Sequence, residues 1–147
     1  IEFSSIEELT LVLRGASDIN INSDISELNA KISGASDLDI NGNVVDSNFK
    51  MSGASRVDID GRGESLVIRI SGASKFDGRE FTVNTISLIA SGASTSHIYS
   101  VDRISVDASS ASKVYHYGTG SIDDFDLSSA ASFKTVDKKL HKHQEKN

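Results

Sequence analysis

The chain has 147 residues, of which 37% are hydrophobic, and it contains neither cysteine nor tryptophan. Its length fits a single domain, and its hydrophobic content is enough for a narrow core. The formal net charge of −6 argues against a nucleic-acid-binding surface, because phosphate binding requires a clustered excess of lysine and arginine.

Two other features narrow the class of protein. Without cysteine, the chain can form neither a disulfide framework nor a thiolate metal site. No run approaches the roughly 18 apolar residues of a membrane-spanning helix, and the longest apolar patch, LVIRI at 66–70, is interrupted by an arginine. The chain begins IEFSS, without the regions of a signal peptide, so we expect a processed or truncated piece of a longer protein.

A four-residue motif recurs along the chain. It reads RGAS at 14–17, SGAS from Ser33, Ser52, Ser71 and Ser91, SSAS from Ser109 and SSAA from Ser128. The positions that correspond to its glycine are separated by 19, 19, 19, 20, 18 and 19 residues, and they are Gly15, Gly34, Gly53, Gly72, Gly92, Ser110 and Ser129. Seven copies at near-constant spacing indicate a repeat architecture.

Apolar and polar residues alternate on both sides of each motif. In chain order, the apolar positions before it include Leu9, Leu11, Leu13; Leu28, Ala30, Ile32; Leu66, Ile68, Ile70; Ile86, Leu88, Ala90; Ile104, Val106 and Ala108. Those after it are Ile19, Ile21; Leu38, Ile40; Val57, Ile59; Phe76, Ile98, Val114 and Phe133. This period of two predicts a strand with one buried face before and after each motif, with turns such as NGN at 41–43 between repeats.

Two folds accommodate strands in this order. Each motif could be the loop of a hairpin in an antiparallel sandwich, but hairpins do not require equivalent residues at a fixed interval. A solenoid does, because each coil lies on the previous one and like residues stack about 4.8 Å apart. The sequence therefore predicts an all-β fold, a parallel β-helix of about seven 19-residue coils, with right-handed winding by the general bias of parallel crossovers.

The small residues of the motif suit a corner that stacks on identical corners. We expect Gly15, Gly34, Gly53, Gly72 and Gly92 to adopt a backbone angle that other residues disfavour. Alanine is expected to point into the core, and serine to bond neighbours or the local backbone. Serine at 110 and 129 implies that the last coils relax or that the angle is not strained.

The recurring pattern of apolar alternation around SGAS resembles the bacterial family called putative auto-transporter adhesin, head GIN domain, found in Bacteroidetes envelope proteins. The resemblance covers approximately residues 9–136. It implies a β-helical, exported protein of the periplasm or cell surface with an adhesive role, and it carries no catalytic residues. It also implies a further amino-terminal portion that this chain lacks.

Outward-facing residues of the strands after each corner are the place to look for a site, because the inward ones form the core. Coil by coil, this face changes from acidic to aromatic: Asp18, Asn20, Asn22; Asp37, Asp39, Asn41; Arg56, Asp58, Asp60; Lys75, Asp77, Arg79; Thr95, His97, Tyr99; Lys113, Tyr115, Tyr117. All three tyrosines of the chain fall on two adjacent coils of this face.

The aromatic end offers a binding site made of His97, Tyr99, Tyr115 and Tyr117. Exposed tyrosines combine flat apolar area with a hydroxyl group, which suits a sugar ring or a protein partner. The alternative is that the rings only stabilise the sheet as cross-strand pairs.

The acidic end offers calcium ligands in Asp37, Asp39, Asp58 and Asp60, because Ca²⁺ prefers oxygen ligands. The alternative is a solvated face neutralised by neighbouring cations. The sequence lacks the nonapeptide of calcium-binding β-rolls, so no cofactor is required.

A polysaccharide-active enzyme on the same scaffold is a rival hypothesis, with Asp58, Lys75, Asp77 and Arg79 as its constellation. Such enzymes need converging carboxylates in a cleft, and the short loops here leave nothing to wall one. The prediction is therefore a non-catalytic binding or adhesion module whose ligand is a surface glycan or a protein. A purely structural spacer is the third hypothesis.

The ends of the chain are expected to differ from the repeats. Residues 1–136 form the predicted β-helix domain, and the strongly polar residues 137–147 form a tail or cap in which His141 and His143 are a weak metal site. An uncovered end of a β-helix exposes unpaired backbone groups, so self-association through ends or edges is a further expectation.

Overall fold

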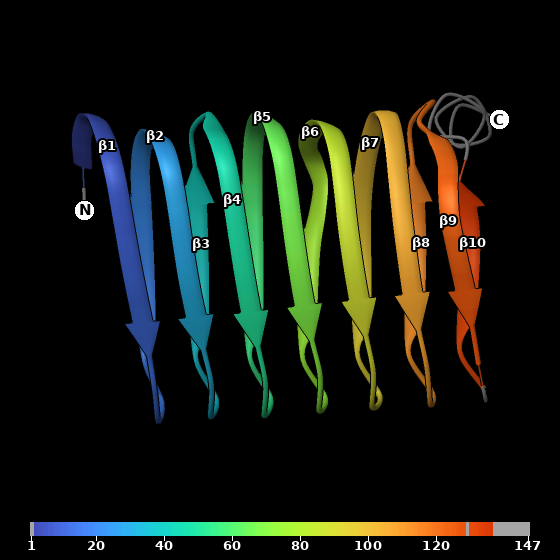
Figure 1. Ribbon diagram of the computed structural model, residues 1–147. Helices are drawn as coiled ribbons and strands as arrows, with labels where there is room; N and C mark the ends of the chain where they lie inside the picture. Colours follow the sequence, from blue (N-terminus) through green and yellow to red (C-terminus); the bar gives the residue numbers. More distant parts are fainter. Residues whose placement is uncertain (1, 129, 137–147) are drawn as a thin grey trace, which may run out of the picture.

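Within residues 2–128 and 130–136, which the computed structural model describes, ten strands form one parallel sheet (Figure 1). In chain order they are β1 (Glu2–Leu13), β2 (Asp18–Ile32), β3 (Asp37–Asn41), β4 (Val44–Met51), β5 (Arg56–Ile70), β6 (Lys75–Ala90), β7 (Thr95–Ala108), β8 (Lys113–Tyr117), β9 (Ser121–Leu127) and β10 (Ser132–Val136). The tail at 137–147 lies outside the described residues. The described part contains no helix, and so none that could cross a membrane.

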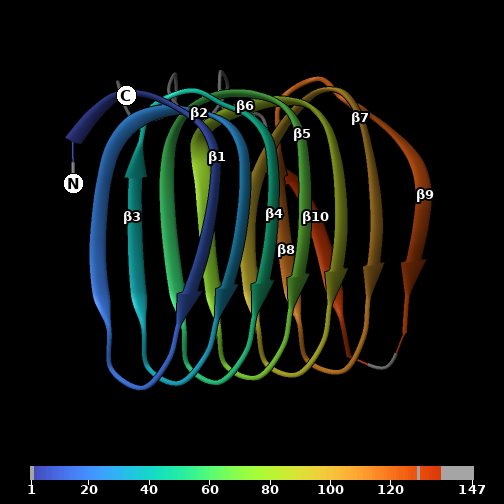
Figure 2. The same cartoon turned by 60° about the vertical axis from the view of Figure 1, so that its left-hand side comes forward.

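The sheet is coiled into a solenoid of about seven turns that lie about 19 residues apart, so the predicted β-helix is confirmed. All the strand pairings of the described residues are parallel, which rules out hairpins of a sandwich. In Figure 1 the chain descends at the front, rises behind and advances from left to right, which is right-handed winding. Figure 2 shows the turns lying one behind another.

The long strands bend around most of a turn, from one corner to the next. Their inward residues alternate with outward ones, as the burial of β2 and β5 shows. The period-two pattern of the sequence is therefore the pattern of core and surface.

One extra residue enters the repeat in β6. The offset between paired residues changes from 19 to 20 between Asp58 with Asp77 and Gly61 with Phe81. The insertion lies where β6 carries the buried Phe81, and it explains the single 20-residue interval in the sequence.

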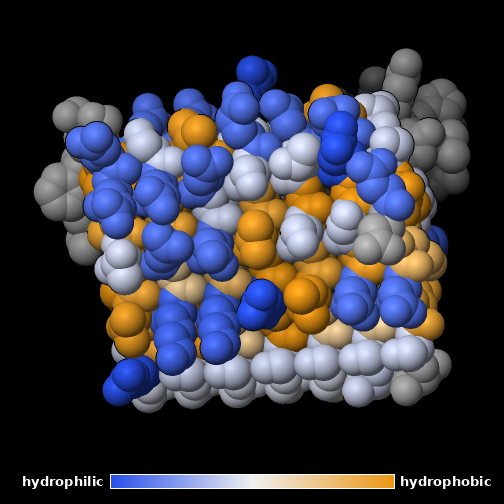
Figure 3. Space-filling model, in the orientation of Figure 1, coloured by the Kyte–Doolittle hydropathy of each residue, from blue (hydrophilic) through white to orange (hydrophobic). Residues whose placement is uncertain are grey.

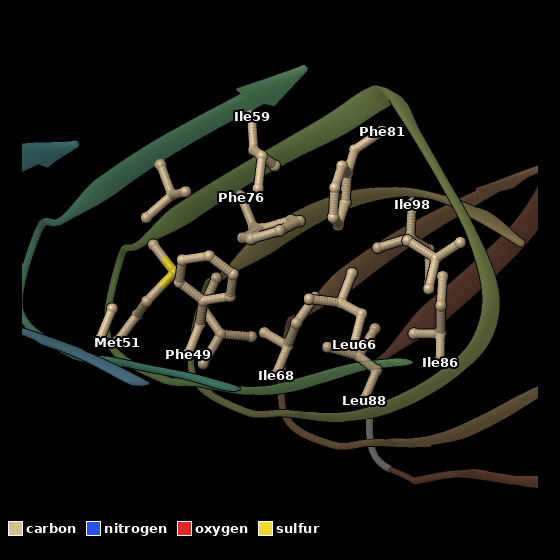
Figure 4. Packing of buried hydrophobic residues seen from close by; sticks show 14 of the residues in the cluster. Phe49, Met51, Ile59, Leu66, Ile68, Phe76, Phe81, Ile86, Leu88 and Ile98 are labelled. Atoms are coloured by element: carbon tan, nitrogen blue, oxygen red, sulfur yellow. The ribbon is translucent and has the colours of Figure 1, made fainter. Parts of the chain in front are cut away.

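Phenylalanine rings fill the middle of the core (Figure 4). Phe49 and Phe76 meet edge to face with their centroids 5.2 Å apart. Phe76 lies over Gly78, where an added Cβ would be 2.9 Å from its ring, and Phe81 lies equally close to Gly63. The two glycines thus make room for rings that a strict repeat could not contain.

The corners are built as expected at their glycines. Gly15, Gly34, Gly53, Gly72 and Gly92 all have φ between +69° and +73°. From the second corner on, the alanine that follows donates its backbone N–H to the glycine carbonyl one coil earlier, at 2.7–2.9 Å. The backbones are so close that a Cβ on Gly53 would lie 2.7 Å from the carbonyl oxygen of Gly34.

The expectation that alanine points into the core is wrong, whereas the expectation that serine bonds the local backbone is confirmed. Ala35 and its counterparts are exposed, whereas the serine that follows, such as Ser36 or Ser55, is buried. The Ser36 hydroxyl donates to the Ser33 carbonyl at 2.9 Å, and the Ser55 hydroxyl donates to the carbonyl at the start of its own motif at 2.6 Å. The second serine turns inward because its hydroxyl satisfies a carbonyl that the tight turn leaves free.

Ser110 keeps the corner conformation without being glycine. Its φ is +61°, and Ala111 still donates to the Gly92 carbonyl at 2.9 Å. The corner of this coil does not relax, so the serine carries the strain of a left-handed backbone.

Replacing glycine by alanine in two corners separates backbone strain from crowding. An added Cβ at Gly15 would have nothing within 4 Å, because no coil precedes it. Gly15→Ala should lower the free energy of unfolding by about 1 kcal/mol, and Gly53→Ala by roughly 2 kcal/mol more because its Cβ meets backbone. Urea unfolding measures both losses. Equal losses would show that the stacked backbone does not select glycine.

Ser110→Gly should stabilise the protein. Glycine removes the left-handed strain, and the greater freedom of the unfolded chain offsets part of the gain. We expect the free energy of unfolding to rise by about 0.5 kcal/mol. Thermal unfolding checks this against Ser109→Gly, which changes the neighbouring corner residue whose φ is not positive. A lower melting temperature for Ser110→Gly than for the parent chain would contradict the strain.

Candidate functional site

The outward residues that follow each corner stack in columns along the solenoid. The strand register sets the middle column as Asn20, Asp39, Asp58, Asp77, His97, Tyr115 and Lys134. The face thus changes from acidic to aromatic, in the order that the sequence indicates. We call His97, Tyr99, Tyr115 and Tyr117, on β7 and β8, the aromatic cluster.

His97 is the centre of the aromatic cluster. Its ring stacks on Tyr115 with centroids 4.7 Å apart and an interplanar angle of 9°. Its Nδ1 atom forms a 3.1 Å hydrogen bond with the Tyr117 hydroxyl, and the two rings are tilted by 33°. The structure therefore brings three of the four predicted residues into direct contact.

Tyr99 lies at the side of the cluster. It is the register neighbour of Tyr117, across β7 and β8. Its ring packs over Gly118, where an added Cβ would lie 2.8 Å from the ring. Tyr99 therefore holds the turn after β8, while the three other residues form the stack.

An ion pair borders the cluster on β6. Arg79 donates from Nε to one carboxylate oxygen of Asp77 at 3.0 Å and from Nη2 to the other at 2.8 Å. Burial alone would raise the pKa of Asp77, but the hydrogen bonds from Arg79 lower it overall. The pKa of Arg79 is raised, mainly by Asp77 and also by Tyr117. A fixed cation and a fixed anion thus stand beside the rings.

The imidazole of His97 favours its neutral form. Partial burial lowers its pKa, and the positive charges of Arg79 and Lys75 lower it further, although Asp77 opposes them. A neutral imidazole can both donate and accept a hydrogen bond. The cluster therefore presents donors and acceptors together with ring surface.

The acidic end of the face has a different character. Asp39 and Asp58 are register neighbours. Burial raises the pKa of Asp58, and Asp77, Asp60 and Asp39 raise it further; the pKa of Asp60 is raised too, mainly by burial. Each added carboxylate thus makes its neighbours harder to ionise.

The proposed calcium ligands Asp37, Asp39, Asp58 and Asp60 do not converge. Across the described residues, no group of three or more His, Asp and Glu side chains is placed to hold a metal ion. The carboxylates stand side by side along a flat face, whereas calcium needs several oxygens around one point. The structure gives the calcium hypothesis no support, and His141 and His143 lie outside the described residues.

The sequence reasoning missed a buried histidine. His116 occupies an inward position beside Ile98, and its Nε2 lies 2.6 Å from the Ser100 hydroxyl. Its ring stacks on Phe133 with centroids 6.0 Å apart, and burial lowers its pKa. The alternation of β8 places residue 116 inside, but a pattern of apolar residues does not indicate a histidine in the core. Because it is buried, His116 supports the last coils and offers no surface chemistry.

The two histidines make stability depend on pH. Their pKa values are lowered in the folded chain, while an unfolded histidine titrates near about 6.5. Below that pH the unfolded chain binds protons that the folded chain resists, so their stabilisation is complete above about pH 6.5 and is lost as the pH falls.

The melting temperature should therefore drop between about pH 7.5 and about pH 5.5, a window above the titration of unshifted carboxylates. His116→Gln keeps a polar group near Ser100 and removes the titration, so its melting temperature should depend less on pH. Thermal unfolding at several pH values checks this. An unchanged slope in His116→Gln would contradict the role of this histidine.

Comparison with known proteins places the chain in a family. The family model described as putative auto-transporter adhesin, head GIN domain, matches residues 1–120. No curated protein and no solved structure matches the chain. Since the match covers most of the 147 residues, the chain belongs to the putative auto-transporter adhesin, head GIN domain, family.

Proposed function

We propose that the chain is a non-catalytic adhesion module of the cell envelope that binds a glycan through the aromatic cluster. The observation that carries the proposal is the stack of His97 on Tyr115 with Tyr117 bonded to the same imidazole, on the outer face of a rigid solenoid. The family name supports an adhesive role at the cell surface.

The way in which the rings pack points to the class of ligand. The stacked faces of His97 and Tyr115 partly cover each other, so the cluster contributes ring edges and polar atoms. The Tyr115 hydroxyl has no hydrogen-bond partner among the described residues, and Arg79 is about half exposed beside Tyr117. Polar groups beside partly apolar rings suit a ligand rich in hydroxyl groups.

The neighbouring carboxylates favour binding over catalysis. A glycosidase needs one carboxylic acid and one free carboxylate on either side of a bond. Asp77 accepts three hydrogen bonds from Arg79, two from its guanidinium and one from its backbone N–H, and Asp58 is its neighbour on the same flat face. Asp58 and Asp77 therefore lie along one side of a bound glycan and do not flank a glycosidic bond.

A glycan-array screen of the purified protein tests the proposal. Tyr115→Ala removes the ring that stacks on His97, and Tyr117→Phe removes only the hydroxyl that bonds it. We expect Tyr115→Ala to weaken binding by about tenfold or more and Tyr117→Phe by less, as for a buried ring contact and one hydrogen bond. Phe125→Ala is the matched control, because it removes an exposed ring from β9.

Circular dichroism confirms that each variant folds before its binding is compared. If the parent chain binds a glycan and Tyr115→Ala binds it equally well, the binding site lies outside the aromatic cluster. Binding of a protein instead of any glycan would retain adhesion and correct the ligand class. The absence of any ligand would favour the structural spacer.

A further inference from the structure

The outward residues that precede each corner form a second face with an ordered pattern of charge. Its column nearest the corner, which we call the corner column, is set by the register as Val12, Lys31, Lys50, Arg69, Ile89, Asp107 and Asp126. After Val12, three cations, one apolar residue and two anions thus follow one another along the solenoid. The changes of offset in β6 and β7 are what align them.

A second column on this face has the opposite order. Four residues before the corner column in each coil, or five in the last, lies what we call the far column, which the register sets as Glu8, Glu27, Asp46, Ser65, Thr85, Arg103 and Ser121. Its anions lie toward the amino-terminal end and its cation lies toward the carboxy-terminal end. The two columns therefore carry their charges in opposite order, with Arg69 in the fourth of the seven coils and Arg103 paired with Asp123 at 3.5 Å.

The cations of the corner column are not neutralised within the described chain. Lys31, Lys50 and Arg69 are exposed, and none of them belongs to an ion pair of the described residues. Like charges on adjacent strands destabilise a sheet. A counter-charge from outside the chain would relieve this repulsion.

Two apolar side chains lie near the middle of the face, next to the exposed Arg69. Ile89 is 45% exposed, and the half-buried Val67 lies on β5 diagonally from it, two residues before the register neighbour of Ile89. Figure 3 shows this face with hydrophobic residues near its middle and hydrophilic residues on both sides. An apolar centre with a charged rim is the usual anatomy of a protein interface.

We propose that this face binds the same face of a second copy, with the two solenoids antiparallel. The two-fold axis lies parallel to the strands and passes between β5 and β6. Lys50 then faces Asp107 of the second copy, and Lys31 faces Asp126 of the second copy. In the far column, Asp46 faces Arg103 of the second copy. A two-fold contact makes each of these pairs twice.

The apolar residues select the antiparallel arrangement. In it, Val67 and Ile89 of both copies surround the axis and form one small cluster, and the aliphatic part of Arg69 faces Ile89 of the second copy. A parallel dimer would also match the charges, by placing Lys50 against Asp46 of the second copy. It would, however, separate the two Ile89 side chains across the width of the face. The antiparallel dimer therefore buries more apolar surface together.

The size of the face sets the strength of the contact. The contact surface spans six coils about 4.8 Å apart and five residues that rise about 3.3 Å each, so its area is on the order of 500 Å² per copy. This area lies at the lower limit for specific interfaces, so the dimer should be weak and sensitive to salt. Weak contacts gain strength when many copies sit on one surface.

Sedimentation equilibrium of the full chain, from micromolar to millimolar concentration, tests the proposal. The parent chain should dimerise at low ionic strength and dissociate at high salt. Lys50→Asp and Asp107→Lys should each weaken the dimer by about tenfold or more, because each brings like charges together. Lys75→Asp is the matched control, since Lys75 lies on the other face.

Two double variants decide the geometry. Lys50→Asp with Asp107→Lys restores opposite charges only in the antiparallel dimer, so it should recover the association of the parent chain. Lys50→Asp with Asp46→Lys restores them only in the parallel dimer, so its recovery would overturn the antiparallel arrangement.

A parent chain that stays monomeric at every concentration would overturn the proposal. A dimer that both single variants leave intact would do so too, because it would use another surface. These outcomes are independent of the aromatic cluster, whose variants are scored by glycan binding.

Discussion

Every residue of this solenoid lies about 4.8 Å from its counterparts in the coils before and after it. A side chain must therefore be compatible with its own equivalents as well as with its local backbone. At the corners the constraint is sharpest, because Ala54 donates to the Gly34 carbonyl at 2.8 Å and leaves no room for a Cβ on the glycine between stacked turns. The four-residue motif recurs in the sequence because each coil has to make that contact.

The same stacking determines how the core can depart from regularity. Phe76 and Phe81 are too large for every coil to carry, and Gly63 and Gly78 lie beneath their rings. The single insertion in β6 enters at this point. Small residues beneath large ones allow the core to vary while the corners stay in line.

On the surface, stacking turns single residues into columns. A column of carboxylates raises the pKa of Asp58, whereas Arg79 lowers that of Asp77 in the same column. Where the column becomes aromatic, His97 and Tyr115 stack in parallel at the spacing of the strands. Ring packing and a binding surface are therefore compatible, since packed rings still expose their edges. On the other face, the same rule segregates cations from anions.

The sequence by itself determined the coil number, the strand positions, the apolar inward residues of the strands and the order of the outer face, because a period of two within a period of 19 leaves one parallel arrangement. It also located the aromatic cluster, since neighbouring coils bring equivalent positions together. Propensity could not decide which corner residue turns inward: alanine was expected there, and Ser36 takes the place because its hydroxyl bonds the Ser33 carbonyl.

Only the tertiary structure decided the details that depend on exact register and side-chain direction. The shifts in β6 and β7 set which charges are neighbours in the corner column and in the far column. The inward position of His116 and its contact with Ser100 depend on how the core packs, which the pattern of apolar residues does not reveal. The carboxylates of the acidic end remain side by side because a flat sheet holds them apart. The order of residues along the chain is enough to give the periodicity of the strands. Whether side chains converge on one point depends on their positions in space, which the order of residues does not give.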